Sequence, residues 1–194
     1  MSKVEEIASS LSPQYKKLTC TWKVASKDGT NDVHMVDFSH IVLDYDEMAK
    51  RHHKEGHYTY RLSSNDAVYI TDDEILYFVE FKNGSFEKVE IAKKGIGSAM
   101  LAMDLGLVHS LKELQERAFY ILVYNSEFIE NKQTKSQKKI SGNLRRKSGR
   151  TITKLPVMKE VEWIYHESFS YTVKEFESEF IQKIVEPEYL VAVE

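Results

Sequence analysis

The stretch that decides the fold runs from residue 63 to residue 84 and reads SSNDAVYITDDEILYFVEFKNG. It contains two runs of β-branched, aromatic and other apolar residues, Ala67–Thr71 and Ile75–Phe81, separated by the polar triplet at 72–74. Such runs on either side of a short polar turn predict a β-hairpin. Because both faces of each strand are apolar, we expect the hairpin to lie inside a sheet that is covered on both sides.

Two charged residues stand in the second strand. Glu80 and Lys82 are two positions apart, which places both side chains on one face of the strand. If the turn is symmetric about Asp73, Asp66 lies opposite Glu80, and cross-strand neighbours have Cβ atoms about 4.5–5.5 Å apart. Toward the turn, the same face carries only apolar residues: Val68, Ile70, Leu76 and Phe78. The sequence therefore predicts an apolar face with a charged end.

The two acids at this end, Asp66 and Glu80, need a positive partner, because close carboxylates repel and desolvation strengthens the repulsion. Lys82 can neutralise part of the charge. A divalent cation such as Mg²⁺ or Mn²⁺ can neutralise the rest, since hard carboxylate oxygens suit these ions. Such a metal can polarise a phosphate and lower the pKa of a bound water. Lys82 would then orient that water or stabilise the developing charge.

The flanking sequence predicts a mixture of helices and strands, and hence an α+β or mixed α/β fold. Helical patterns cover 4–11, 46–54 and 96–107, and capping boxes at Ser110 and Thr172 open two more helices, the last of which should end near Val185. Strand patterns cover 15–24, 57–62 and 118–124. From about 46 to 124 the expected order is helix, strand, strand, strand, helix, strand, and the second helix allows a crossover to a parallel strand.

A pair of lysines and a pair of glycines precede the predicted helix at 96–107. Gly95 and Gly97 do not complete a phosphate-binding loop motif, so we expect them to let the helix begin after Lys93 and Lys94. Both lysines are then expected in solvent at the helix end, with contact to nucleic acid as the alternative.

Asp66 followed by Glu80-Phe81-Lys82 resembles the PD-(D/E)xK motif of restriction endonucleases and Holliday junction resolvases. That superfamily has a helix, three antiparallel strands, a helix and a further strand, which is similar to the order expected here for residues 46–124. The resemblance implies a restriction-endonuclease-like αβββαβ core with a central mixed sheet flanked by helices. It also implies that Asp66 and Glu80 bind the metal, with the main-chain carbonyl of Phe81 assisting, and that Lys82 is the catalytic lysine.

Many members of the superfamily add a glutamate from the helix that precedes the sheet. Glu47 is the best-placed match for this fourth catalytic residue, and Glu5 or Glu6 could serve if the first helix packs there. The sequence departs from the motif at Asn65, which stands where the motif has a proline before Asp66.

A basic segment, residues 131–150, carries eight Lys or Arg side chains and no acid, whereas the whole chain has a net charge of −3. Its low apolar content predicts a mobile insertion. Its cations would contact nucleic-acid phosphates and make binding salt-sensitive. The candidate phosphate-binding residues are Lys138, Lys139, Arg145, Arg146, Lys147 and Arg150. A solvated loop without a partner is the equal alternative.

The length of 194 residues predicts one domain, 1–194, with the nuclease-like core at about 46–124 and a C-terminal strand and helix at 151–194. The N-terminal residues lack the apolar run of a signal peptide, and the chain shows no apolar stretch long enough for a membrane helix. The single cysteine, Cys20, excludes an internal disulfide. We therefore expect a cytoplasmic protein that does not enter the membrane.

Two functions stay open at this point. The first is a metal-dependent endo- or exonuclease that acts on DNA or RNA phosphodiesters, with a two-fold homodimer expected for an enzyme that cuts both strands. The second is a catalytically inactive binding module with the same fold, for example in a bacterial or phage defence or toxin system. In that case Glu80 and Lys82 form an ordinary salt bridge.

Deleting residues 131–150 is expected to flatten the salt dependence of nucleic-acid binding, because each Lys or Arg that contacts a phosphate releases counterions. The measurement is the slope of log Kd against log salt concentration for the full chain and the deletion variant with the same oligonucleotide. An unchanged slope would show that the segment makes no phosphate contacts.

Overall fold

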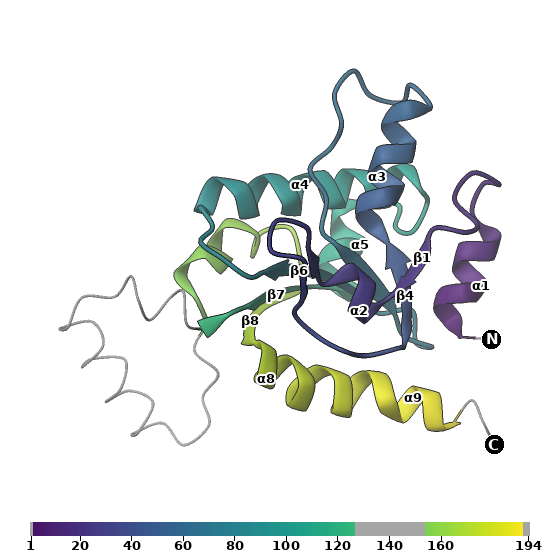
Figure 1. Ribbon diagram of the computed structural model, residues 1–194. Helices are drawn as coiled ribbons and strands as arrows, with labels where there is room; N and C mark the ends of the chain where they lie inside the picture. Colours follow the sequence, from purple (N-terminus) through teal and green to yellow (C-terminus); the bar gives the residue numbers. More distant parts are fainter. Residues whose placement is uncertain (1, 127–153, 192–194) are drawn as a thin grey trace.

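A six-stranded mixed sheet, ordered β1-β4-β5-β6-β7-β8, forms the centre of the protein (Figure 1). The computed structural model describes residues 2–126 and 154–191. The strands β1 to β6 of this sheet pair antiparallel, whereas β6, β7 and β8 are parallel. The six strands are β1 (Thr19–Thr21), β4 (Ile41–Asp44), β5 (Ala67–Ile70), β6 (Leu76–Lys82), β7 (Ala118–Tyr124) and β8 (Glu167–Thr172).

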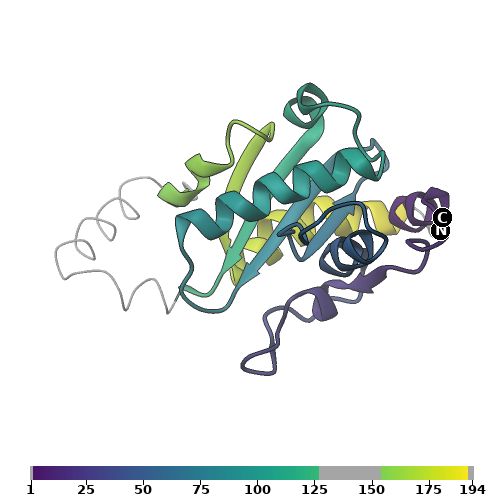
Figure 2. The same cartoon turned by 90° about the horizontal axis from the view of Figure 1, so that it is seen from above.

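Helices cover both faces of this sheet and give the fold three layers (Figures 1 and 2). On one face α4 (Lys88–Asp104) runs across the strands, and α3 (Tyr45–Lys54) stands beside it. The other face is covered by a C-terminal helical stretch composed of α8 (Val173–Glu175), the π-helix η2 (Phe176–Val185) and α9 (Glu186–Val191). The predicted mixed α+β class, with a doubly covered sheet, is therefore confirmed.

Shorter elements complete the described part of the chain. They are α1 (Lys3–Ser10), α2 (Trp22–Ala25), α5 (Leu111–Arg117), the 3₁₀ helix η1 (Pro156–Glu160) and a two-stranded ribbon of β2 (Lys27–Asp28) and β3 (Val33–His34). The predicted capping boxes lie at helix starts: Ser110 Oγ accepts the amide of Glu113, and Thr172 makes a reciprocal box with Glu175.

The predicted hairpin forms with the predicted register. Ala67 pairs with Val79 and Ile70 pairs with Leu76, so the pairing is symmetric about Asp73. All residues of β5 are buried, as expected for a strand in the interior of a covered sheet. The predicted crossover also forms, because α4 carries the chain from β6 to the parallel strand β7, which occupies the predicted range 118–124.

An aromatic cluster joins the hairpin to the C-terminal helices. Trp22 is fully buried, and its ring lies 5.5 Å from the ring of Phe176 and 5.8 Å from that of Phe180, both in edge-on geometry. Beyond this cluster, Glu188 of α9 accepts hydrogen bonds from the Tyr69 hydroxyl (2.6 Å) and from the amide of Asp72 (3.2 Å). The C-terminal helices are thus fastened to β5 and to the turn that follows it.

The predicted strand at 57–62 was wrong. These residues form no ladder, and the third antiparallel strand is β4, which precedes α3 and pairs with β5 through Leu43 and Val68. Two residues of 57–62 contact helices instead: the His57 ring stacks on His52 of α3 at 4.0 Å, and the Tyr58 hydroxyl donates to Asp104 of α4. The predicted strand at 15–24 is also shorter than expected, because the Thr21 side chain caps α2.

The predicted start of the helix at residue 96 was also wrong, since α4 begins at Lys88. Its glycines lie inside the helix and allow close packing. A Cβ at Gly97 would stand 2.0 Å from the carbonyl oxygen of Ser63. Next to it, the Ser98 hydroxyl accepts the Asn65 amide at 2.8 Å. Helix α4 is therefore held against the segment that leads into the hairpin.

Two further predictions concern the end of the C-terminal helix and the basic segment. The helix expected to end near Val185 changes there from π-helical to α-helical hydrogen bonding and continues as α9. Pro187 does not end it, because it stands in the first turn of α9, where a proline is tolerated. The predicted basic insertion at 131–150, with its six candidate phosphate-binding residues, lies outside the described residues. Within residues 2–126 and 154–191, no helix is long and apolar enough to cross a membrane.

The close approach of α4 to Ser63 predicts that Gly97→Ala lowers the free energy of unfolding by about 1–3 kcal/mol through overpacking. This loss would occur although alanine is normally favoured over glycine inside a helix by about 1 kcal/mol. Gly84→Ala is the control, because nothing lies within 4 Å of its Cβ position. Urea unfolding of both variants measures the difference, and equal stabilities would contradict the close packing.

Candidate functional site

Asp66 and Glu80 lie side by side where β5 and β6 separate. Regular pairing ends at Ala67 and Val79, and beyond it the amide of Phe81 donates to Asp66 Oδ2 at 2.7 Å. The Asp66 side chain thus takes the place of the next backbone acceptor in the ladder. Glu80 is fully buried beside it. The predicted juxtaposition of the two acids is therefore present in the structure.

Lys94 of α4 lies between the two acids. Its Nζ atom is 2.6 Å from Glu80 Oε1, 2.8 Å from Glu80 Oε2 and 3.4 Å from Asp66 Oδ1. The expectation that Lys94 lies in solvent was wrong, since its side chain is only 20% exposed. Extending the predicted helix back to Lys88 would have placed Lys94 on its inner face. Lys94 stands three residues after Ile91 and four before Ser98, both of which are buried, and residues at these spacings share one face of a helix.

Lys82 lies on the same side of the sheet as Glu80, as predicted. Its Nζ atom is 3.2 Å from Glu80 Oε1, and it also forms an ion pair with Glu90 of α4. The Lys82 side chain is 16% exposed, so it does not project into bulk water. Sequence reasoning missed Glu90 for the same reason that it missed Lys94, since both stand on the part of α4 that was assigned to a loop.

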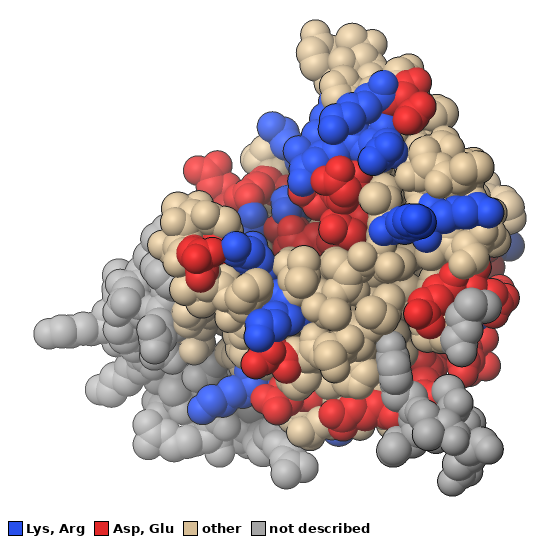
Figure 3. Space-filling view, turned by 45° about the vertical axis from the view of Figure 1, so that its right-hand side comes forward, with Lys and Arg blue, Asp and Glu red and all other residues tan. Residues whose placement is uncertain are grey.

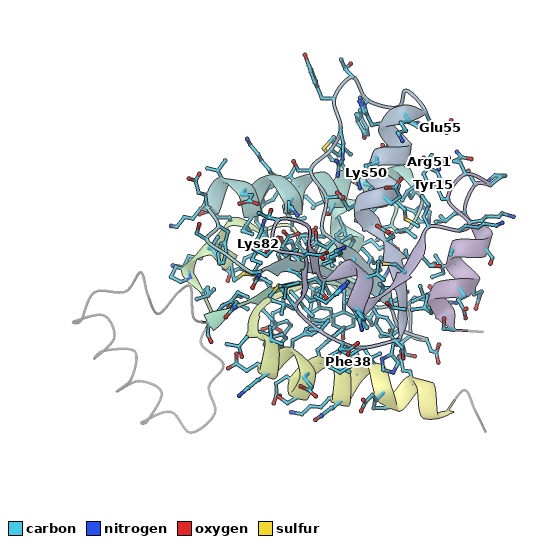
Figure 4. All side chains as sticks on the ribbon, in the orientation of Figure 1. Tyr15, Phe38, Lys50, Arg51, Glu55 and Lys82 are labelled. Atoms are coloured by element: carbon cyan, nitrogen blue, oxygen red, sulfur yellow. The ribbon has the colours of Figure 1, made fainter. Side chains whose placement is uncertain are left out.

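The four charged groups Asp66, Glu80, Lys82 and Lys94 line a pocket of roughly 400 Å³ that opens at the end of β6. Residues 26–31, which include β2 and the start of the turn that leads to β3, also line this pocket. Asn83 fastens this turn by donating to Asp28 Oδ2 at 3.0 Å. Figure 4 shows Lys82 among the side chains near the centre of the molecule, whereas Lys50, Arg51 and Glu55 lie along α3.

Burial decides the electrostatics of the two acids. It raises the pKa of Glu80 to about 8; Asp66 adds to this shift, and Lys94 and Lys82 oppose it. Burial also raises the pKa of Asp66, against the pull of Lys94. Burial alone would lower the pKa of Lys94, but Glu80 and Asp66 outweigh it and hold that pKa above its usual value. The site therefore holds a charged lysine next to a carboxyl group that resists ionisation.

The other predicted site residues lie elsewhere or act differently. Glu47 is in the first turn of α3 and pairs with Lys50 at 3.2 Å. Glu5 caps α1 through Ser2, and Glu6 pairs with Lys3, so the ion pairs and hydrogen bonds of these glutamates within the described residues are not with Asp66 or Glu80. Phe81 lines the pocket, its ring packs on the opposite face of the sheet against Trp22 and Phe176, and the role expected for its main-chain carbonyl stays a prediction.

The donor set fits a metal that binds few protein ligands. Within residues 2–126 and 154–191, no three or more His, Cys, Asp or Glu side chains are grouped to hold a metal ion. Mg²⁺ is usually bound through one or two carboxylates and keeps several waters, so Asp66 and Glu80 suffice for it. Glu80 Oε1 is buried and, apart from its ion-pair contacts with the two lysines, accepts no hydrogen bond within the described residues. This oxygen is suited to a metal ion.

Comparisons with protein-family models, with curated proteins and with solved structures find no match to this chain. A function for the pocket has to be inferred from its residues: two adjacent carboxylates, two ammonium groups and an opening at the end of β6.

The raised pKa of Glu80 predicts how stability changes with pH in the presence of a chelator. Between about pH 4.5 and pH 8 the folded state keeps a proton on Glu80 that the unfolded state releases. The free energy of unfolding should therefore fall as pH rises, by at most about 1.4 kcal/mol per pH unit for this group. Glu80→Gln, which does not titrate at this position, should lose this part of the slope.

Urea unfolding at pH 5, 6, 7 and 8 measures both slopes. The exposed acid Glu116 offers the control, because Glu116→Gln should keep the wild-type slope. Parallel stability curves for wild type and Glu80→Gln would contradict a raised pKa at this position.

Proposed function

We propose that this protein is a metal-dependent nuclease that hydrolyses phosphodiester bonds of DNA or RNA on a restriction-endonuclease-like core. One observation carries the proposal: Asp66, Glu80 and Lys82, the three residues of the PD-(D/E)xK-like motif, meet at one pocket. The element order also supports it, because the hairpin is followed by a helix and a parallel strand. If Glu80-Phe81-Lys82 matched the motif only by chance, there would be no reason for Asp66, fourteen residues earlier, to line the same pocket.

In this proposal each motif residue has a separate role. Asp66 and Glu80 would hold Mg²⁺ or Mn²⁺, which would polarise the scissile phosphate and lower the pKa of a bound water. The amide of Phe81 orients the Asp66 carboxylate through its 2.7 Å hydrogen bond. Glu90 and Glu80 hold the Lys82 ammonium between them, where it would stabilise negative charge on the phosphate as the bond breaks.

The way the chain leaves the sheet supports nucleic acid as the substrate. Tyr124, the last residue of β7, pairs with Lys82, and the next residue, Asn125, donates to Asn83 at 3.2 Å. In the sequence, the basic segment 131–150 begins a few residues after β7, whose end lies beside Lys82 and Asn83 of the pocket. On the face that Figure 3 shows, Lys and Arg gather mainly in the upper part and are mixed with acids. We propose that the basic segment supplies phosphate contacts that this mixed surface does not.

A second candidate function has its own observation. Lys94 and Lys82 together compensate the charges of Asp66 and Glu80 without any metal, through contacts of 2.6 to 3.4 Å. A protein that kept the fold and lost the chemistry would be stable in this arrangement. The alternative proposal is therefore an inactive nuclease-fold module that binds nucleic acid or another partner.

Nuclease activity is tested by titrating Mg²⁺ and Mn²⁺ against single- and double-stranded DNA and RNA. We expect wild-type cleavage to depend on the metal, and both Glu80→Gln and Lys82→Ala to lower the rate at least about 100-fold, because each removes a group that acts on the transition state. Lys93→Ala is the matched control, since Lys93 is exposed one residue before Lys94 and should retain wild-type activity. Equal cleavage by all four proteins would indicate a contaminating nuclease and favour the inactive module.

A further inference from the structure

The Lys94 ammonium stands where a bridging metal would stand. Three oxygens from two carboxylates surround its Nζ atom, at 2.6, 2.8 and 3.4 Å. A Mg²⁺ ion shared by the same carboxylates would lie about 2.0–2.1 Å from its oxygen ligands. Nζ and a hydrated metal cannot both occupy the space between Asp66 and Glu80.

A count of charges points the same way. A metal binds only ionised carboxylates, and in that form Asp66, Glu80 and Glu90 face the ammonium groups of Lys82 and Lys94. This leaves one net negative charge. A divalent cation added beside both lysines would leave one net positive charge next to the fully buried Glu80. Departure of one lysine brings the site to neutrality, and excess charge in a buried place is costly.

The two lysines differ in their freedom to leave. Lys82 is held from two sides, by Glu80 and by Glu90. The ion pairs of Lys94 are with Asp66 and Glu80, the same carboxylates that the metal would take. Its side chain lines the pocket, is 20% exposed and has a flexible four-carbon stem.

The backbone of α4 cannot carry Lys94 away. Gly95 and Gly97, which follow it, have no room for even one added carbon, because Val161 and Ser63 lie against them. With α4 held by this packing, exchange requires rotation of the Lys94 side chain within the pocket that it lines together with residues 26–31.

We infer that Lys94 is a built-in counter-cation: its ammonium occupies the metal position in the metal-free protein and leaves that position when a divalent cation binds. This inference rests on the proposed metal-dependent function and adds a step to it. Lys94 stabilises the empty site, lowers its affinity for the metal, and is a positioning residue that contacts neither substrate nor reacting atoms.

Calorimetric titration with Mn²⁺ alone, without nucleic acid, tests this competition. Lys94→Met keeps the length of the side chain and removes the charge, so we expect it to bind Mn²⁺ at least tenfold more tightly than wild type. We also expect its melting temperature to be lower than wild type with a chelator and to rise more on addition of Mn²⁺. Lys93→Met is the matched control and should bind Mn²⁺ as wild type does.

The outcomes separate the inference from the function on which it rests. Equal Mn²⁺ affinities for wild type and Lys94→Met would overturn the inference and leave the metal site standing. Absence of Mn²⁺ binding in every variant, Lys94→Met included, would overturn both.

Wild-type protein gives a second test, which holds even if Lys94→Met does not fold. Amine-reactive labelling followed by peptide mass spectrometry measures how accessible each lysine is. Lys94 should be protected with a chelator and become several-fold more reactive at saturating Mn²⁺, whereas the exposed Lys93 should react equally in both conditions. Unchanged protection of Lys94 with Mn²⁺ bound would overturn the inference.

Discussion

The burial of Glu80 beside Asp66 is the constraint on which the rest of the structure depends. Two carboxylates on neighbouring strands cannot both be ionised in a covered sheet without compensation, and Lys94 supplies it from α4. That contact requires α4 to lie very close to the hairpin. Gly97, which admits the carbonyl of Ser63, makes the approach possible, and the Ser98 hydroxyl fixes it. The same turn of α4, residues 94–98, thus supplies both the charge that compensates the two acids and the close packing against the hairpin.

Strand β6 joins this charged site to the aromatic core. Glu80 and Phe81 are consecutive, so one side chain faces α4 while the other packs with Trp22 and Phe176 on the opposite face. The site is therefore built on a central strand that is held in both directions by pairing, with β5 on one side and β7 on the other. Such rigid support is what a set of reacting groups needs in order to keep its geometry.

The hairpin and its charged end could be predicted because their signals are local. A symmetric turn and a period of two fix which residues face each other, and the observed register follows from them. Lys94 and Glu90 could not be predicted, because the glycines at 95 and 97 were interpreted as a helix start when they serve close packing. The strand expected at 57–62 failed for another reason. His57 and Tyr58 contact α3 and α4 instead of a neighbouring strand, so alternation alone did not indicate a ladder.

The attachment of Glu188 to Tyr69 and Asp72 has a consequence for the order of events during synthesis. The aromatic face of the hairpin is complete once residue 81 has left the ribosome, but its cover, Phe176 and Phe180, arrives about a hundred residues later. Until then a nascent chain would present Trp22, Tyr69 and Phe81 to water. Exposed apolar surface of this kind invites chaperone binding or aggregation, and the last helices of the chain end that exposure.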